Sequence, residues 1–150
     1  MTTTTSTVDR VTDGRVRALV KEWYEALDRH DPLESVLEYL APEGLEMTFP
    51  EGKLRGTAEF ADWYRTVTHR FFDEVHELVS VDPEPAGPGR HRVRVVVNWQ
   101  ARIWEPPTPN STWLGFVATQ TWTVVDSVGG VRIVEYIVDE LAPMPGSGSL

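Results

Sequence analysis

The chain has 150 residues, the size of one ordinary domain, and it contains no cysteine, which excludes disulfides, thiolate nucleophiles and cysteine-ligated metal centres. Its formal net charge of −9 opposes the field of a phosphate backbone, so we expect no nucleic-acid partner. No apolar stretch approaches the ~20 residues needed to span a bilayer, and the Thr-rich start lacks the features of a signal peptide. We therefore expect a cytoplasmic protein without membrane contact.

Composition divides the chain into one domain and two tails. Residues 1–12 are polar and Thr-rich, and residues 143–150 are rich in Gly, Pro and Ser, so neither segment can bury much apolar surface. We expect a disordered N-terminal tail, a flexible C-terminal tail and a single folded domain over residues 13–142.

Two helices are expected at the start of this domain. After a cap at Asp13, apolar residues recur at helical spacing until a helix end near His30. Asp31 and Pro32 then have the pattern of an acidic cap and a first-turn proline. This pattern predicts a short second helix that ends before Pro42.

Beyond these helices the sequence predicts one strand, a third helix and a sheet. Residues 45–49 alternate as a half-buried strand does, and helical spacing returns over residues 60–71. From residue 74 onward the period changes to two, with turns rich in Pro and Gly between the runs. Three helices before such runs predict an α+β domain in which the helices close one face of a strongly curved antiparallel sheet. The expected strands span residues 74–82, 91–104, 112–125 and 131–139.

Alternation within the predicted strands indicates which side chains face the helices. Over residues 112–125 one face is apolar except for Gln120. A buried amide must be hydrogen bonded or cost about 1–3 kcal/mol, so Gln120 is either tied to a neighbour or aimed into a cavity. Over residues 131–139 both faces are mixed, and periodicity leaves both alternatives open. The outward face carries apolar residues that a homodimer would explain, namely Trp104, Trp113 and Val117.

Three segments together resemble a known superfamily. They are Trp23–Leu27 near the end of the first helix, Pro50–Gly52 before Gly56, and Trp63–Arg65 in the third helix. In this order they resemble the nuclear transport factor 2-like superfamily, which includes ketosteroid isomerase, limonene epoxide hydrolase, scytalone dehydratase and the SnoaL-like polyketide cyclases. The resemblance implies a cone-shaped α+β barrel with a ligand pocket between the curved sheet and the helices.

The resemblance also implies several pocket residues. Trp23 stands where ketosteroid isomerase has a pocket tyrosine, and Tyr64 matches another tyrosine of that pocket. Phe49 stands at the position of the isomerase's catalytic aspartate, and because a phenyl ring cannot accept a proton, isomerisation by that site is disfavoured. In the last strand the resemblance turns one of the two mixed faces toward the pocket, with Tyr136, Val138 and Glu140.

His76 is the histidine that we expect to act in catalysis. It lies in the first long strand and shares a face with Leu78, and imidazole is the usual general base near neutral pH. The plain alternative is a histidine satisfied by a partner or placed at a pocket rim. Surface positions are expected for His30, His69 and His91. The other catalytic residues that we expect are Tyr64 and Tyr136 as donors to an oxyanion and Gln120 as an orienting group.

Aromatic residues are expected to form the wall of the pocket. Six tryptophans are many for this length, and a conical sheet would leave some of them lining an apolar cavity rather than filling a core. The Pro-rich loop at residues 105–111 either borders the cavity mouth or is an inert hairpin. The substrate-binding residues that we expect are Trp23, Phe49, Trp63, Trp99, Phe116, Trp122, Val138 and Glu140.

No metal and no cofactor are expected. No His-x-His or His-x-x-x-His spacing occurs, and no phosphate-binding or dinucleotide fingerprint is present. The hypothesis is therefore a cofactor-independent enzyme that acts on a hydrophobic, polyketide- or isoprenoid-like small molecule by proton transfer, as a cyclase, dehydratase or isomerase. The alternative is a non-catalytic binding or dimeric assembly module of the same fold. An open cavity with a polar cluster would favour catalysis, and a cone packed solid would favour assembly.

Overall fold

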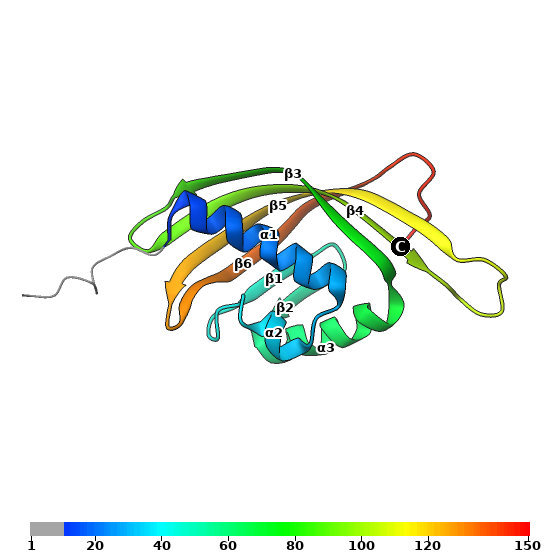
Figure 1. Cartoon of the computed structure of the whole chain (residues 1–150), viewed down its shortest axis with the longest axis horizontal. Helices are drawn as coiled ribbons and strands as arrows, with labels where there is room; N and C mark the ends of the chain where they lie inside the picture. Colours follow the sequence, from blue (N-terminus) through cyan, green and yellow to red (C-terminus); the bar gives the residue numbers. More distant parts are fainter. Residues whose placement is uncertain (1–10) are drawn as a thin grey trace, which may run out of the picture.

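The computed structural model describes residues 11–150 and shows three helices packed against one six-stranded sheet, which arches over them (Figure 1). This α+β architecture confirms the predicted fold class. Of the expected N-terminal tail, residues 1–10 lie outside the described residues. In chain order the elements are α1 (Asp13–Arg29), α2 (Leu33–Leu37), β1 (Glu46–Phe49), β2 (Gly52–Arg55), α3 (Gly56–Arg70), β3 (Phe72–Pro85), β4 (Arg90–Ile103), β5 (Thr112–Ser127) and β6 (Gly130–Pro143).

The sheet has the strand order β2-β1-β6-β5-β4-β3. The four long strands β3 to β6 form an antiparallel meander, as the period of two predicts. One pairing differs from the expectation, because β1 runs parallel to β6, with Met47 opposite Tyr136. The sheet is therefore mostly rather than wholly antiparallel. The short strand β2, which the sequence did not predict, pairs with β1 at the sheet edge.

The N-cap residue of helix α1 is one residue earlier than the sequence predicts. The side chain of Thr12, not that of Asp13, accepts a hydrogen bond from the backbone N–H of Arg15 at 3.2 Å. Asp13 is the first helical residue and contacts His91 on β4 at 3.1 Å. At the other end His30 takes the left-handed conformation with φ 53°, which ends the helix where the sequence predicts.

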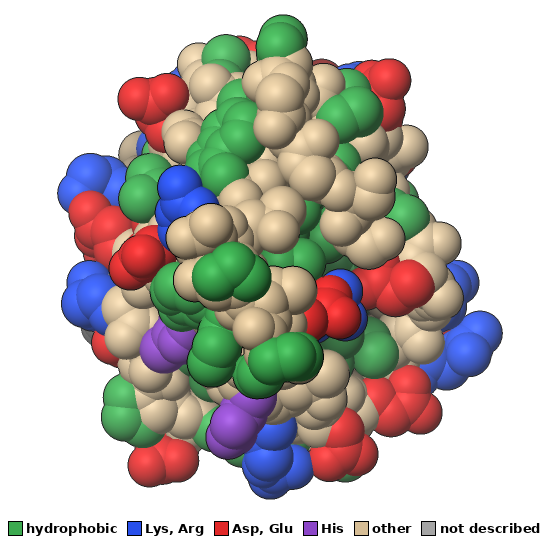
Figure 2. Space-filling model, turned by 90° about the vertical axis from the view of Figure 1, so that its right-hand side faces the viewer, with side chains coloured by type: hydrophobic (Ala, Val, Ile, Leu, Met, Phe, Trp, Pro, Cys, Tyr) green, Lys and Arg blue, Asp and Glu red, His purple; other side chains and the backbone are tan. Residues whose placement is uncertain are grey.

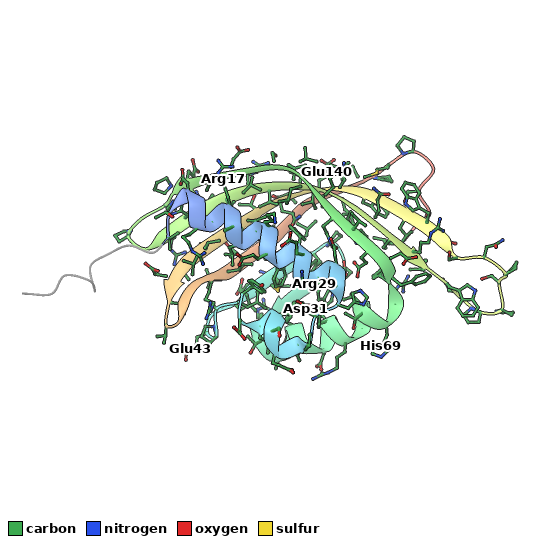
Figure 3. The ribbon with its side chains drawn as sticks, viewed as in Figure 1. Arg17, Arg29, Asp31, Glu43, His69 and Glu140 are labelled. Carbon is green, nitrogen blue, oxygen red and sulfur yellow. The ribbon has the colours of Figure 1, made fainter. Side chains whose placement is uncertain are left out.

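Helix α2 lacks the expected acidic cap. Pro32 is the N-cap residue, and no side chain caps the helix. The Asp31 carboxylate is instead paired with the Arg29 guanidinium, at 3.0 and 2.8 Å (Figure 3). A two-pronged charged pair with a cation satisfies both carboxylate oxygens, so the backbone of α2 does not compete for them.

The main core lies between α1 and the concave side of the sheet. Trp23 and Trp122 are almost fully buried there, with ring centroids 6.5 Å apart in an edge-to-face arrangement. A second, smaller cluster around Leu114 and Ala101 lies toward the far end of the β4–β5 hairpin. A cavity takes its wall from both clusters, with Tyr24 and Tyr136 from the main core and Phe71 from the second.

In strand β6 the alternation of inward and outward residues is interrupted twice. This explains why its sequence has two mixed faces. Its pairing with β5 shifts by one residue at Val134 and again at Asp139, so each of these is the extra residue of a β-bulge. A bulge places two consecutive residues on the outer side and so moves the inward positions by one. The inward residues are therefore Ile133 before the first bulge, Tyr136 and Val138 between the bulges, and Leu141 after the second.

Glu140 does not face the cone, contrary to the expectation from the resemblance. Because Asp139 is a bulge residue, Glu140 pairs with Thr119 on the outer side of the sheet and is exposed. Figure 3 shows it on the side of the sheet turned away from the helices. Of the three residues expected to face the cone, Tyr136 and Val138 do so and Glu140 does not.

The segment after β6 has a defined course along β5. The backbone N–H of Met144 donates to Gly115 O at 2.8 Å, and the N–H of Gly148 donates to Trp113 O at 3.0 Å. The Ser147 hydroxyl accepts from the N–H of Gly115 at 2.9 Å. These bonds carry the chain back toward the cavity, where Leu150 contributes to the wall.

Candidate functional site

A cavity of about 580 Å³ lies between the concave side of the sheet and helices α1 and α3. Its wall is mostly apolar and draws on both helices, on β3 to β6 and on the segment between β1 and β2. Figure 2 looks onto the end of the molecule that carries the C-terminal segment, where hydrophobic side chains gather among acidic and basic ones. The volume is that of a site for one small organic molecule.

A histidine–aspartate pair lies in the wall of this cavity. Nδ1 of His76 on β3 is 2.6 Å from Oδ1 of Asp28 on α1, and the His76 backbone N–H donates to Oδ2 at 3.0 Å. The side chains are largely buried, with exposed fractions of 11% for His76 and 24% for Asp28. The Tyr24 ring stacks on the imidazole with centroids 4.6 Å apart, which fixes the ring plane.

The aspartate also selects the imidazole tautomer. A carboxylate accepts the proton on Nδ1, so the lone pair of the neutral ring is on Nε2. Among the described residues no hydrogen bond to His76 Nε2 is present. Since the ring lines the cavity, Nε2 is the basic atom that the pair offers to a bound molecule.

A second polar cluster in the wall joins Tyr24, Gln120 and Tyr136. Trp122 Nε1, which can only donate, bonds Gln120 Oε1 at 3.1 Å and so identifies Nε2 as the amide nitrogen. That nitrogen donates to Tyr24 Oη at 2.8 Å, and Tyr24 Oη is 3.1 Å from Tyr136 Oη. Gln120 is therefore tied to neighbours and contributes to the cavity wall as well, so both sequence alternatives apply to it.

The bonds of this cluster place a donor at its cavity end. Tyr24 Oη is also 3.0 Å from Gln120 Oε1, so its single proton is given either to that oxygen or to Tyr136 Oη. When Tyr136 accepts this proton, its own O–H is directed away from Tyr24 and is available to a ligand. The cluster then ends in a hydroxyl that can stabilise negative charge on a ligand oxygen.

Burial keeps these phenols protonated. It raises the pKa of Tyr136 to about 12 and the pKa of Tyr24 well above its usual value of 10.0. A protonated phenol is a hydrogen-bond donor and not a base. The two clusters therefore offer complementary groups, a base at His76 and a donor at Tyr136.

Tyr64 also contributes to the wall, but its proton is already used. Its O–H donates to the backbone carbonyl of Asp31 at 2.6 Å. Burial, followed by the negative charges of Asp31 and Glu74, raises its pKa to about 12. Tyr64 therefore fixes the start of α2 against α3, and toward the cavity it presents an acceptor rather than the expected donor.

Aromatic rings form the apolar part of the wall. Phe49 and Trp63 stack with centroids 4.6 Å apart, and Trp99 stacks at longer range on the His76 ring at 6.3 Å. Phe49, at the position of the isomerase's aspartate, brings no acid or base. Within residues 11–150 the structure shows no group of three or more His, Asp or Glu side chains placed to hold a metal ion. In the same range no helix is long and apolar enough to cross a membrane.

Comparison with known proteins assigns the family. The sequence matches the SnoaL-like domain model over residues 20–136, which is most of the chain. The chain belongs to the SnoaL-like family. This confirms the superfamily that the three sequence segments indicated. Among curated protein sequences none matches this chain.

Solved structures share the fold of this SnoaL-like protein at low sequence identity. The dehydrochlorinase for hexachlorocyclohexane, LinA-type3, from Novosphingobium barchaimii has 13% identity and a TM-score of 0.72, covering 91% of this chain and 92% of that one. A protein provisionally identified as a scytalone dehydratase from Novosphingobium aromaticivorans has 14% identity and a TM-score of 0.69, with 90% and 87% covered. A provisional dehydratase of the NTF2-like family from Streptomyces avermitilis has 16% identity and a TM-score of 0.71, with 88% and 95% covered.

The SnoaL-like cavity brings together only part of the expected wall. Its wall includes His76, Tyr64, Tyr136 and Gln120, and of the expected substrate-binding residues Phe49, Trp63, Trp99 and Val138. Trp23 and Trp122 are core residues behind the wall, with exposed fractions of 1% and 0%. Phe116 and Glu140 border a neighbouring hollow, which shares Val138, Leu141 and Leu150 with the cavity. No residue of the loop 105–111 borders the cavity, and in Figure 1 this loop projects beyond the sheet.

Sequence reasoning missed two residues of the SnoaL-like site. Tyr24 is the residue of α1 that lines the cavity at this point, whereas its neighbour Trp23, which the resemblance matched to a pocket tyrosine, lies in the core. Asp28 was not among the expected site residues. It lies four residues after Tyr24 and therefore on the same helix face, which is a signal that the sequence contained.

Proposed function

We propose that this SnoaL-like protein is an enzyme that removes a proton from carbon in a largely apolar small molecule, using its own side chains. The observation that supports this most directly is the Asp28–His76 pair in the wall of a mainly apolar cavity. An open cavity with polar clusters favours catalysis over the alternative of a non-catalytic assembly module. The names of two solved structures of this fold, a provisional scytalone dehydratase and a hexachlorocyclohexane dehydrochlorinase, denote eliminations, which agrees with the proposed chemistry.

The proposed reaction begins at His76. Its Nε2 takes a proton from a carbon next to a carbonyl group, and the imidazolium that forms is stabilised by the Asp28 carboxylate at 2.6 Å. The negative charge that develops on the carbonyl oxygen is stabilised by the Tyr136 O–H. A positioned base contributes about 100-fold to 10,000-fold to such a step. Proton removal next to a carbonyl group is the first step of the reactions of a cyclase, a dehydratase or an isomerase.

The substrate class follows from the wall. Stacked Phe49 and Trp63 and the Trp99 ring offer flat apolar surfaces, and polar contacts are concentrated at the two clusters. A polyketide- or isoprenoid-like molecule with one carbonyl group fits this distribution. The homodimer stays a prediction. Of the residues that suggested it, Trp104 is exposed just beyond the end of β4, whereas Trp113 and Val117 are half-buried; Val79 on β3 is a further exposed apolar residue.

Deuterium exchange tests the proposed function. The probe is 4-phenylbutan-2-one in D₂O, whose carbonyl-adjacent protons are followed by proton NMR. We expect the wild-type protein to catalyse exchange and His76→Gln to lose about 100-fold or more of the rate. The matched control is His69→Gln, because His69 is exposed on α3 and, within residues 11–150, its ring is hydrogen bonded to the Arg65 carbonyl alone. Equal exchange rates for wild type and His76→Gln would contradict the proposal.

A further inference from the structure

A second carboxylate–histidine pair lies in the wall of the same cavity. Glu74 precedes His76 by two residues on β3 and also lines the cavity. Its Oε1 is 2.7 Å from Nε2 of His30, and its Oε2 accepts from Trp99 Nε1 at 2.9 Å. The Glu74 side chain is 10% exposed, which is unusual for a carboxylate outside a functional or paired setting.

Glu74 lies on the same side of β3 as His76, at the end of the strand where the backbone is irregular. Between Phe72 and Val75, two residues of β3 oppose one residue of β4, which is the arrangement of a β-bulge. Asp73 in this bulge has the left-handed conformation with φ 52°, which non-glycine residues adopt only at a cost. Glu74 is the second of the two residues in this bulge, next to the strained Asp73, and lines the cavity.

Trp99 links the two pairs. Its ring stacks on His76 at 6.3 Å between centroids, and its indole nitrogen holds Glu74. Residues i and i+2 of one strand face the same side with their Cα atoms about 6–7 Å apart, so Glu74 and His76 present their side chains to the same cavity as neighbours. The two groups can therefore act on neighbouring atoms of one bound molecule.

His30 connects Glu74 to the solvent. It lies at the end of α1 in a left-handed conformation, and its side chain is 28% exposed. The other face of the pair, at Glu74, belongs to the cavity wall. A proton can thus enter at His30 and be presented to the cavity by Glu74.

We propose that Glu74, supplied by His30, is the acid that protonates a leaving hydroxyl group, so that the reaction is a dehydration and the substrate class is a β-hydroxy ketone. This inference rests on the proposed function of His76. The C–H proton goes to His76 Nε2, and the C–H electron pair becomes the new C=C bond. The C–O bond breaks with its electron pair on oxygen, the Glu74 proton goes to that oxygen, and water leaves. His76 then returns its proton to water, and His30 reloads Glu74 from the solvent.

The leaving group distinguishes this role from a merely structural one. The probes are 4-hydroxy-4-phenylbutan-2-one, which must lose a protonated hydroxyl, and its acetate ester, which loses acetate without needing a proton. For Glu74→Gln we expect dehydration of the alcohol to fall about 100-fold, while elimination from the acetate and deuterium exchange at the carbonyl-adjacent carbon stay within about threefold of wild type. The matched control is Glu77→Gln, an exposed carboxylate on the same strand.

A second variant keeps the test decisive if Glu74→Gln does not fold. His30→Asn retains a residue that tolerates the left-handed backbone, and it should also lose dehydration of the alcohol selectively. Equal losses on alcohol and acetate, or retained dehydration of the alcohol in either folded variant, would overturn the proposal. Wild-type exchange without any dehydration would overturn it and leave the His76 proposal intact. If His76→Gln kept both the exchange and the dehydration at the wild-type rate, the His76 proposal and the Glu74 proposal would both be overturned.

Discussion

Asp28 on α1 receives two hydrogen bonds from His76 on β3, although the residues are 48 positions apart in the sequence. One bond comes from the ring and the other from the backbone, so a single carboxylate fixes both the imidazole and the strand that carries it. The contact joins the helix to the sheet at the cavity wall. Positioning of the base and docking of α1 onto β3 therefore depend on the same side chain.

Asp28→Asn should reduce proton transfer while keeping the fold. An amide has the same shape as a carboxylate, but it can donate its N–H to His76 Nδ1 and so reverse the tautomer, which places the proton on Nε2. It also carries no charge to stabilise the imidazolium. We expect the exchange rate of 4-phenylbutan-2-one to fall at least about 100-fold.

A control for Asp28→Asn is Asp62→Asn. Asp62 is an exposed residue of α3 that pairs with Arg65 at 2.9 Å, away from the cavity wall. The exchange rate of this variant should equal that of the wild type. If Asp28→Asn exchanged protons at the wild-type rate, the carboxylate would have no part in orienting the base.

Tyr136→Phe and Tyr24→Phe should have different effects. Tyr136 is the cavity end of its hydrogen-bond cluster, so its loss removes the donor to the oxyanion and should lower the rate about 100-fold. Tyr24 is the middle of the cluster, and its loss leaves buried polar atoms of Gln120 and Tyr136 without this partner. We expect Tyr24→Phe to lower the free energy of unfolding by about 1–3 kcal/mol.

Exchange rates and denaturant unfolding of both variants check this division of roles. If Tyr136→Phe and Tyr24→Phe lost the same stability and exchanged protons at the same rate, Tyr136 would not act as the donor.

High pH should destabilise the fold through buried tyrosines. Burial raises the pKa of Tyr136 from 10.0 in the unfolded chain to about 12 in the folded chain, so the folded state binds this proton more tightly. Its stabilising contribution is complete below pH 10 and is lost as the pH rises toward 12. For Tyr136 this amounts to roughly 1–3 kcal/mol, since each pKa unit corresponds to about 1.4 kcal/mol.

Urea unfolding at several pH values between 8 and 11.5 measures this effect. The decrease in the free energy of unfolding above pH 10 should be smaller in Tyr136→Phe than in the wild type. The same decrease in both proteins would show that the phenol is not protected by burial.

Val138→Trp should block ligand binding, whereas Glu140→Gln should not affect it. Val138 is an inward residue of β6 in the cavity wall, and an indole at this position would occupy part of the 580 Å³. Glu140 is on the outer side of the second bulge. Binding of 4-phenylbutan-2-one, followed by the quenching of tryptophan fluorescence or by NMR, should weaken at least about tenfold in the first variant. Weakening by Glu140→Gln would contradict the placement of the bulge at Asp139.

Local periodicity determined most of the elements of this protein. The ends of α1 near residues 13 and 30 and the four long strands follow from neighbouring residues in the sequence, because helical and extended backbones repeat their buried positions every 3.6 and every two residues. The polar Gln120 on an apolar face marked the cavity wall for the same reason. Three spaced aromatic and Pro-Gly segments then sufficed to indicate the family.

Tertiary structure decided which of these residues meet. Trp23 and Tyr24 are neighbours in the sequence and equally aromatic, and only the rotation of α1 on the sheet places one in the core and the other in the cavity. In β6 the bulges at Val134 and Asp139 shift the inward face twice, which a period of two cannot express. Asp28 meets His76 only because α1 crosses β3, since the approach of residues far apart in the sequence depends on packing and not on local pattern.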